Sequence, residues 1–175
     1  MTILTDPRVA EYQQDWGGEE VHGMIRGLRS FFPRSPHHLI GWWGYVWTPG
    51  ENIGQCLLPK VPGRIAPRFN EPHDVVDPQF TCGFYSYRLE GIPPYHQDQG
   101  TMWAVIEGWG NTLVGAKGFR CEIAEIVALA PNGGVPIQGR LLFKSMAQDI
   151  SRYYNVPLLP DLENLLAEFA LGEFA

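Results

Sequence analysis

The stretch from Thr81 to Leu129 constrains the fold more than any other part of this chain. It contains an apolar segment at 81–89, a long aromatic-rich segment at 101–115, a glycine turn and a third apolar segment at 119–129. Side chains in the long segment alternate between two types, which is the pattern of a β-strand with two different faces. One face would carry Trp103, Val105, Glu107 and Trp109, and the other Met102, Ala104, Ile106 and Gly108.

Segment 119–129 is compatible with two secondary structures. Its apolar residues also fit one face of a helix, as Phe119, Ile123, Ile126, Val127 and Ala130 do. Frequent Ile and Val, together with the Gly-Ala-Lys-Gly turn at 115–118, favour a strand that forms a hairpin with the long one.

Alternating residues at 21–33 and the apolar run Leu39–Trp47 predict two further strands, joined by a loop that contains His37 and His38. Residues 51–80 contain five prolines and no sustained period, so we expect a long loop there. Such loops are usually functional, disordered or held by something other than their own secondary structure.

Helical spacing is clearest near the C-terminal end. Residues 137–154 predict a helix, with Leu142, Met146, Ile150 and Tyr153 on its apolar face. Asp161 is a typical N-cap for a second, shorter helix whose apolar face would be formed by Leu162, Leu165, Leu166 and Phe169. The predicted fold is therefore α+β: a strongly bent antiparallel sheet or partial barrel with C-terminal helices packed on it.

Charge divides the chain of 175 residues into a body and two acidic ends. Residues 1–20 carry five acids and one arginine, and residues 161–175 carry four acids and no base, whereas the remainder is slightly basic. We expect an acidic N-terminal arm at 1–20 and a single α+β domain at 21–175. The arm would be loosely docked, or would dock on a partner or a second copy through Tyr12 and Trp16.

No apolar stretch is long enough to span a membrane, and the first residues lack the basic-then-apolar order of a signal peptide. Three widely spaced cysteines do not make a disulfide framework. These features predict a cytoplasmic protein without a membrane partner, and they leave its oligomeric state open.

Several motifs occur along the chain: GLRSF, WTPGENIGQC, a proline-flanked His73, TCGFYSY, VIEGWGNTLVGAKGFRCEIAEIVAL and RYYNVPLL. Together they resemble those of a family of small actinobacterial and actinobacteriophage proteins. The resemblance covers roughly residues 24–170 and implies a fold and a taxonomic setting more than an activity. Two positions depart from the family pattern: Phe80 replaces a cysteine, and Cys121 replaces an alanine.

The first chemical hypothesis is a zinc site in the long loop. Cys56, His73 and Cys82 are three ligands of the type that structural zinc prefers, and the family pattern implies a fourth at position 80. Phe80 removes that ligand, and Cys121 could replace it only if 119–129 lies beside 80–83. The alternative is that the cysteines are small buried hydrophobic residues and that no cofactor is bound.

The second hypothesis is a ligand-binding groove formed by Tyr85, Glu107, Trp109 and Arg120. An arginine beside a glutamate and a tryptophan could bind a planar or anionic ligand by paired hydrogen bonds and stacking. The alternative is a structural ion pair between Arg120 and Glu107 or Glu122 that covers the edge of the tryptophan.

Nucleic-acid binding is a further alternative, carried by basic residues and histidines with aromatic residues between them. These are Arg26, Arg29, Arg34, His37, His38, Lys60, Arg64 and Arg68. The two acidic ends oppose it.

The motifs of nucleophilic, zinc-protease and phosphate-binding enzymes are absent, and His96 near Asp98 is the sequence's one suggestion of acid–base chemistry. The leading hypothesis is therefore a non-enzymatic binding or regulatory module that acts through a protein partner, such as an actinobacterial or phage modulator of a host factor. A small-molecule enzyme or sensor that uses the predicted groove is the alternative.

Overall fold

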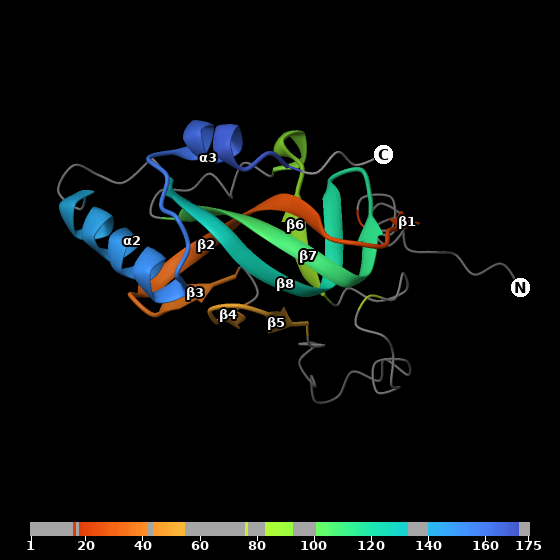
Figure 1. Ribbon diagram of the computed structural model, residues 1–175, viewed down its shortest axis with the longest axis horizontal. Coiled ribbons are helices and arrows are strands. Elements are labelled where there is room, and N and C mark those ends of the chain that lie inside the picture. The colour runs from red at the N-terminus through yellow and green to blue at the C-terminus, as the bar shows by residue number, and fades with distance from the viewer. Residues whose placement is uncertain are drawn as a thin grey trace, which may run out of the picture.

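The computed structural model describes Trp16 and residues 18–41, 44–54, 76, 83–92, 101–132 and 140–171 (Figure 1). The strands are β1 (Glu19–Glu20), β2 (Ile25–Ser35), β3 (His38–Ile40), β4 (Val46–Trp47), β5 (Asn52–Ile53), β6 (Phe84–Tyr87), β7 (Met102–Val114) and β8 (Gly118–Pro131). The helices are η1 (Leu89–Gly91), α2 (Arg140–Tyr154) and α3 (Leu162–Glu168).

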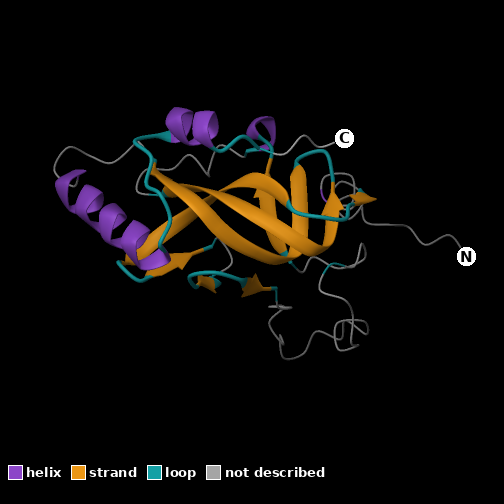
Figure 2. Ribbon diagram, viewed as in Figure 1, coloured by secondary structure: helices purple, strands orange, loops and turns teal. Residues whose placement is uncertain are grey.

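The strands form one bent antiparallel sheet in the order β1-β7-β8-β6-β2-β3-β4, with β5 paired to β8. Strand β2 pairs with β7 as well as with β6, so β2, β7, β8 and β6 close a ring. Figure 2 shows the sheet curling on itself, with helices to one side and above. This confirms the predicted α+β fold, a strongly bent antiparallel sheet with C-terminal helices.

Residues 118–131 are a strand, as the preceding turn favoured. β8 pairs with β7 along its length, from Val114 opposite Phe119 to Met102 opposite Pro131. The two predicted faces of β7 are also confirmed, because Met102, Ala104 and Ile106 belong to one buried cluster and Trp103 and Val105 to another.

The single strand predicted at 39–47 is wrong. The backbone turns after Ile40, where Gly44 N donates to Gly41 O and Gly41 N donates to Tyr45 O, so that β3 and β4 form a short hairpin. Gly44 has a φ of 80°, which favours glycine and explains why an otherwise apolar run is interrupted.

The interior of the closed sheet is narrow, and glycines on two strands face the phenyl group of Phe119. A Cβ at Gly108 would lie 2.6 Å from Phe119 Cε2, and one at Gly27 would lie 2.7 Å from Phe119 Cε1. A side chain larger than hydrogen therefore does not fit at either position without a shift of the ring.

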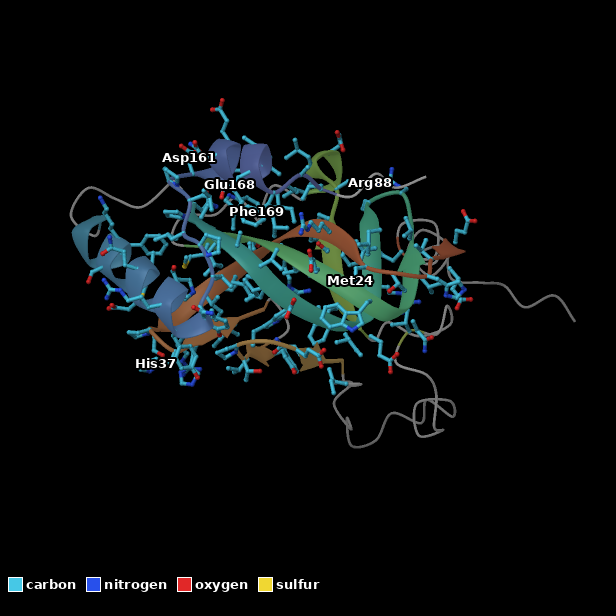
Figure 3. The ribbon with its side chains drawn as sticks, viewed as in Figure 1. Met24, His37, Arg88, Asp161, Glu168 and Phe169 are labelled. Carbon is cyan, nitrogen blue, oxygen red and sulfur yellow. The ribbon has the colours of Figure 1, made fainter. Side chains whose placement is uncertain are left out.

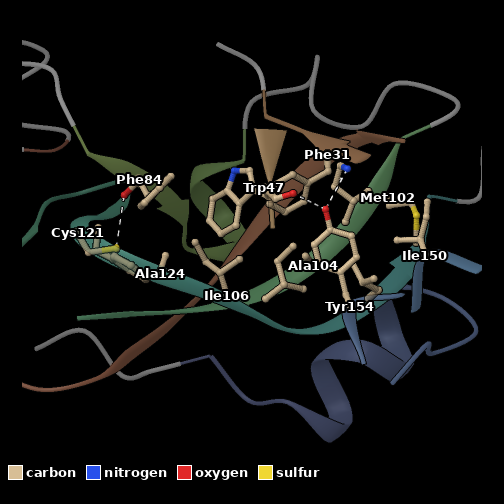
Figure 4. Close-up of a cluster of buried hydrophobic side chains, with 14 of the residues drawn as sticks. Phe31, Trp47, Phe84, Met102, Ala104, Ile106, Cys121, Ala124, Ile150 and Tyr154 are labelled. Carbon is tan, nitrogen blue, oxygen red and sulfur yellow. Dashed lines mark hydrogen bonds between the residues drawn. The ribbon is translucent and has the colours of Figure 1, made fainter. Parts of the chain in front are cut away.

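Helix α2 covers the open side of the larger core, shown in Figure 4. The Tyr154 hydroxyl donates to Trp47 O at 2.6 Å and accepts from Leu39 N at 3.2 Å, which ties the helix to the β3–β4 hairpin. The apolar face of α2 was predicted to end at Tyr153, but the buried tyrosine is the next residue. Tyr154 is buried, whereas Tyr153 is 44% exposed and packs against His37.

Helix α3 begins at the predicted cap, where Asp161 Oδ1 accepts from Asn164 N at 2.9 Å. Its predicted apolar residues pack on the second face of β7 and β8, over Trp103, Val105 and Ala128. The outer face of the sheet is therefore covered at one end by α3.

Candidate functional site

The four residues predicted to line one groove form two pairs. Tyr85 on β6 lies opposite Arg120 on β8. Glu107 and Trp109 share a face of β7, where they lie opposite Glu125 and Ile123, whereas Arg120 lies opposite Leu113. The strand register thus brings Tyr85 to Arg120 and Glu107 to Trp109, and it places four residues of β8 between Arg120 and Glu125, the partner of Glu107.

Arg120 is completely buried beneath Trp16. Its Nε donates to the carbonyl oxygen of Trp16 at 3.2 Å, and the Trp16 ring packs edge-on against Tyr85 and Tyr87 at 4.9 and 5.1 Å. Glu19–Glu20 then pairs with β7 at Leu113 and Val114. The described end of the predicted arm thus packs on the body of the same chain through Trp16, a residue that the sequence analysis considered as a contact to a partner or a second copy.

The carboxylate of Glu107 pairs with Arg26, which is its neighbour on β2. Nε of Arg26 donates to Glu107 Oε1 at 2.6 Å, and Nη2 forms an ion pair with the same oxygen at 2.6 Å. The Glu107 side chain is 13% exposed and that of Arg26 43%. The position of Arg26 directly across from Glu107 therefore determines which arginine pairs with that carboxylate. The sequence analysis considered Arg120 as the partner and missed Arg26.

The part of the outer sheet face around Glu107 carries two parallel rows of side chains. Arg26, Glu107 and Glu125 form a charged row across β2, β7 and β8. Trp109, Ile123 and Ile53 form an apolar row across β7, β8 and β5. We call these two rows, with Met24 and Glu51 at their ends, the outer-face patch.

The outer-face patch is accessible at its ends and half-buried at its centre. Ile53 is 58% exposed and Met24 64%, whereas Trp109, Ile123 and Glu125 are of intermediate exposure. Met24 is labelled in Figure 3, where it lies in front of the sheet. Solvent-exposed apolar side chains in a row, with charges beside them, are typical of contact surfaces on proteins.

The acidic side chains of the outer-face patch outnumber its basic side chains, so the patch has a net negative charge. Burial raises the pKa of the Glu125 carboxyl, and the negative charges of Glu107 and Glu51 raise it further. Arg26 is already paired with Glu107, and among the described residues Glu125 has no hydrogen-bond or ion-pair partner. A cation placed over Glu125 would relieve this repulsion.

The predicted zinc ligands Cys56, His73 and Cys82 lie outside the described residues. Cys121 lies beside β6 as the hypothesis required, but its Sγ faces Phe84 O at 3.8 Å inside the core. Burial raises the pKa of this thiol, which disfavours the thiolate that a metal needs. Within the described part of the chain, no group of three His, Cys, Asp or Glu residues could hold a metal ion.

Two of the basic residues proposed to contact phosphates are committed elsewhere. Arg26 is in the ion pair with Glu107, and Arg29 is buried in the core. Arg34, His37 and His38 are on β2, the following turn and β3, and Lys60, Arg64 and Arg68 lie outside the described residues.

Comparisons with known proteins place no relative beside this chain. No protein-family model, no curated protein and no solved structure matches it. Among the described residues, no helix has both the length and the apolar composition needed to cross a membrane. Functional inference therefore rests on the geometry of the outer-face patch and of the core.

Proposed function

We propose that this protein is a non-enzymatic recognition module whose outer-face patch binds a basic and apolar segment of a partner protein. The observation that carries the proposal is the row of acidic side chains at Glu107 and Glu125, which repel each other beside an exposed apolar row. A sequence selected for stability alone would not place like charges directly opposite each other in a sheet.

The geometry selects the chemistry of the partner. A lysine or arginine over Glu125 would pair with a carboxylate that has no partner among the described residues, and would offset the repulsion from Glu107 and Glu51. Apolar partner side chains would cover Trp109, Ile123 and Ile53, of which the tryptophan is the residue type most often found at binding hot spots. The neighbouring rows therefore call for basic and apolar residues close together in the partner.

The alternative of one small-molecule groove has less support. Tyr85 and the buried Arg120 lie under Trp16, whereas Glu107 and Trp109 form a half-buried pair beside Arg26. The proposal retains the cytoplasmic setting, and the actinobacterial or phage origin, that the sequence predicts, and it rests on neither.

Selection from a displayed library of random peptides tests the proposal. We expect the peptides enriched on the wild-type protein to combine basic with apolar residues, and to bind Glu125→Gln and Ile53→Ser about tenfold more weakly. Glu90→Gln, which removes an exposed charge at η1, is the matched control and should bind like wild type.

Enrichment of acidic or uncharged peptides, or equal binding to wild type and Glu125→Gln, would contradict the proposal. So would the loss of binding in the Glu90→Gln control, because that residue lies on a different part of the molecule. A lysate pull-down that recovers no partner, together with a strictly monomeric and inert protein, would also count against it.

A further inference from the structure

A positive charge lies inside the core, away from the outer-face patch. The Arg29 side chain is on the inner face of β2, between Gly27 and Phe31, and the residue is 6% exposed. Burial lowers the pKa of its guanidinium to about 10, with Tyr87 and Cys121 acting in the opposite direction, so the group remains charged at neutral pH. No aspartate or glutamate of the described residues pairs with it.

The fold compensates this charge only in part. Nη1 of Arg29 donates to Tyr85 O at 2.5 Å. The guanidinium carbon lies 5.2 Å from the Trp47 ring centroid and 5.6 Å from that of Phe31, within the range of cation–π attraction. A buried guanidinium held by one carbonyl and two rings is still far from satisfied, because all five of its N–H groups are donors.

Two buried donors, one from Arg29 and one from Trp47, have no acceptor among the described residues. Neither Nε of Arg29 nor Nε1 of the Trp47 indole has a hydrogen-bond partner among the residues that the structure describes. Both side chains border Gly41, where an added Cβ would lie 2.9 Å from Arg29 Nη2 and 3.5 Å from Trp47 Nε1. Nη2 of Arg29 and the indole N–H of Trp47 thus both lie close to Gly41.

The unmet donors select one kind of ligand. The Nε and Nη2 groups share one edge of a guanidinium, and that edge matches the two oxygens of a carboxylate. Nη1, on the other side, is the atom bound to Tyr85 O. A water molecule could accept from these donors, but it would leave the buried charge without a counterion.

We propose that Arg29 and Trp47 form a binding site for a small carboxylate, held by the Nε–Nη2 edge of the guanidinium and by the indole N–H. The site lies under β4, the last strand in the sheet order, so the ligand would enter at the edge of the sheet. The site goes beyond the proposed function, since none of its residues belongs to the outer-face patch.

Acetate binding to the full chain tests the site. The probe is the ¹H–¹⁵N spectrum of the tryptophan indoles, in which Trp47→Phe identifies the Trp47 signal. We expect acetate, titrated at constant ionic strength against chloride, to shift the Trp47 indole signal with saturation. The melting temperature should rise over the same range of concentration.

Arg29→Met should abolish both responses, and Trp47→Phe should weaken acetate binding about tenfold through the loss of one hydrogen bond. Arg152→Met is the matched control, because Arg152 is exposed and pairs with Asp149 on the surface, and it should respond like wild type. The wild-type titration tests the site even if Arg29→Met fails to fold.

Three outcomes would overturn the proposal. The first is a Trp47 indole signal that does not move with acetate, and the second is a response to inorganic phosphate alone. The third is a nuclear Overhauser contact from the Trp47 indole to a bound water that persists unchanged in saturating acetate, because that would assign the donors to water.

Discussion

Replacing Glu125 with glutamine should stabilise this protein at neutral pH. Glu125 lies directly opposite Glu107 in the β7–β8 pair, and Arg26 neutralises only Glu107. Like charges facing each other across two strands cost roughly 0.2–1 kcal/mol, and solvent screening at this half-buried site favours the lower half of that range. We expect Glu125→Gln to raise the free energy of unfolding by about 0.5 kcal/mol.

The stability difference between wild type and Glu125→Gln should depend on pH. Because the folded-state pKa of Glu125 is raised above the ordinary value of 4.5, protonation of the carboxyl favours the folded state. Its stabilising contribution is complete below the unfolded-state pKa and is lost as the pH rises through the folded-state pKa. The advantage of Glu125→Gln should therefore be present near neutral pH and vanish in acid below the ordinary value.

Urea unfolding of wild type and Glu125→Gln, at about pH 7 and about pH 3.5, measures the difference directly. In thermal unfolding, about 0.5 kcal/mol corresponds to a rise of about 1–2 °C for a chain of this length. Glu90→Gln is the control and should change little at either pH. A variant that is less stable than wild type at neutral pH, or equally stabilised at both, would refute the reasoning.

Substitutions at three further positions test the fold. Tyr154→Phe should lower the free energy of unfolding by about 1–3 kcal/mol in urea titration, because it removes both hydrogen bonds by which α2 holds the β3–β4 hairpin. Gly108→Ala should cost about 1–3 kcal/mol in the same assay, since its Cβ would meet the Phe119 ring, and an unchanged midpoint would contradict the packing. Asp161→Ala should lower the melting temperature and Asp161→Asn should not, because either cap side chain can accept from Asn164 N. Bonding to Asn164 lowers the pKa of Asp161, so the stability advantage of wild type over Asp161→Ala should shrink as the pH falls through that pKa.

The sequence pattern predicted those strands and helices that have two different faces. The alternation in β7 is preserved from Met102 to Gly108 because its two faces have different surroundings. One face lines the ring interior, and the other is covered by α3 at one end and forms part of the outer-face patch at the other. The cap at Asp161 was predictable because it involves residues three apart. The interruption between β3 and β4 was not, because an aromatic-rich run gave no sign of the positive φ at Gly44.

The candidate site depends on strand register, which local patterns do not determine. Glu107 was correctly placed beside Trp109, but its partner comes from a strand 81 residues earlier. Arg120 was expected to line a groove, yet Trp16 covers it from a segment about one hundred residues away in the chain. Arg29 in an alternating strand reads as a surface residue until the ring closes around it.

The central claim is that the outer-face patch is the recognition surface, and amide chemical-shift mapping of a bound basic peptide tests it most directly. We expect the largest shifts at Ile53, Trp109 and Ile123–Glu125, with α2 and its hairpin unaffected. Shifts concentrated on α2 or α3 instead, or a peptide that binds without perturbing β5, β7 and β8, would contradict the account.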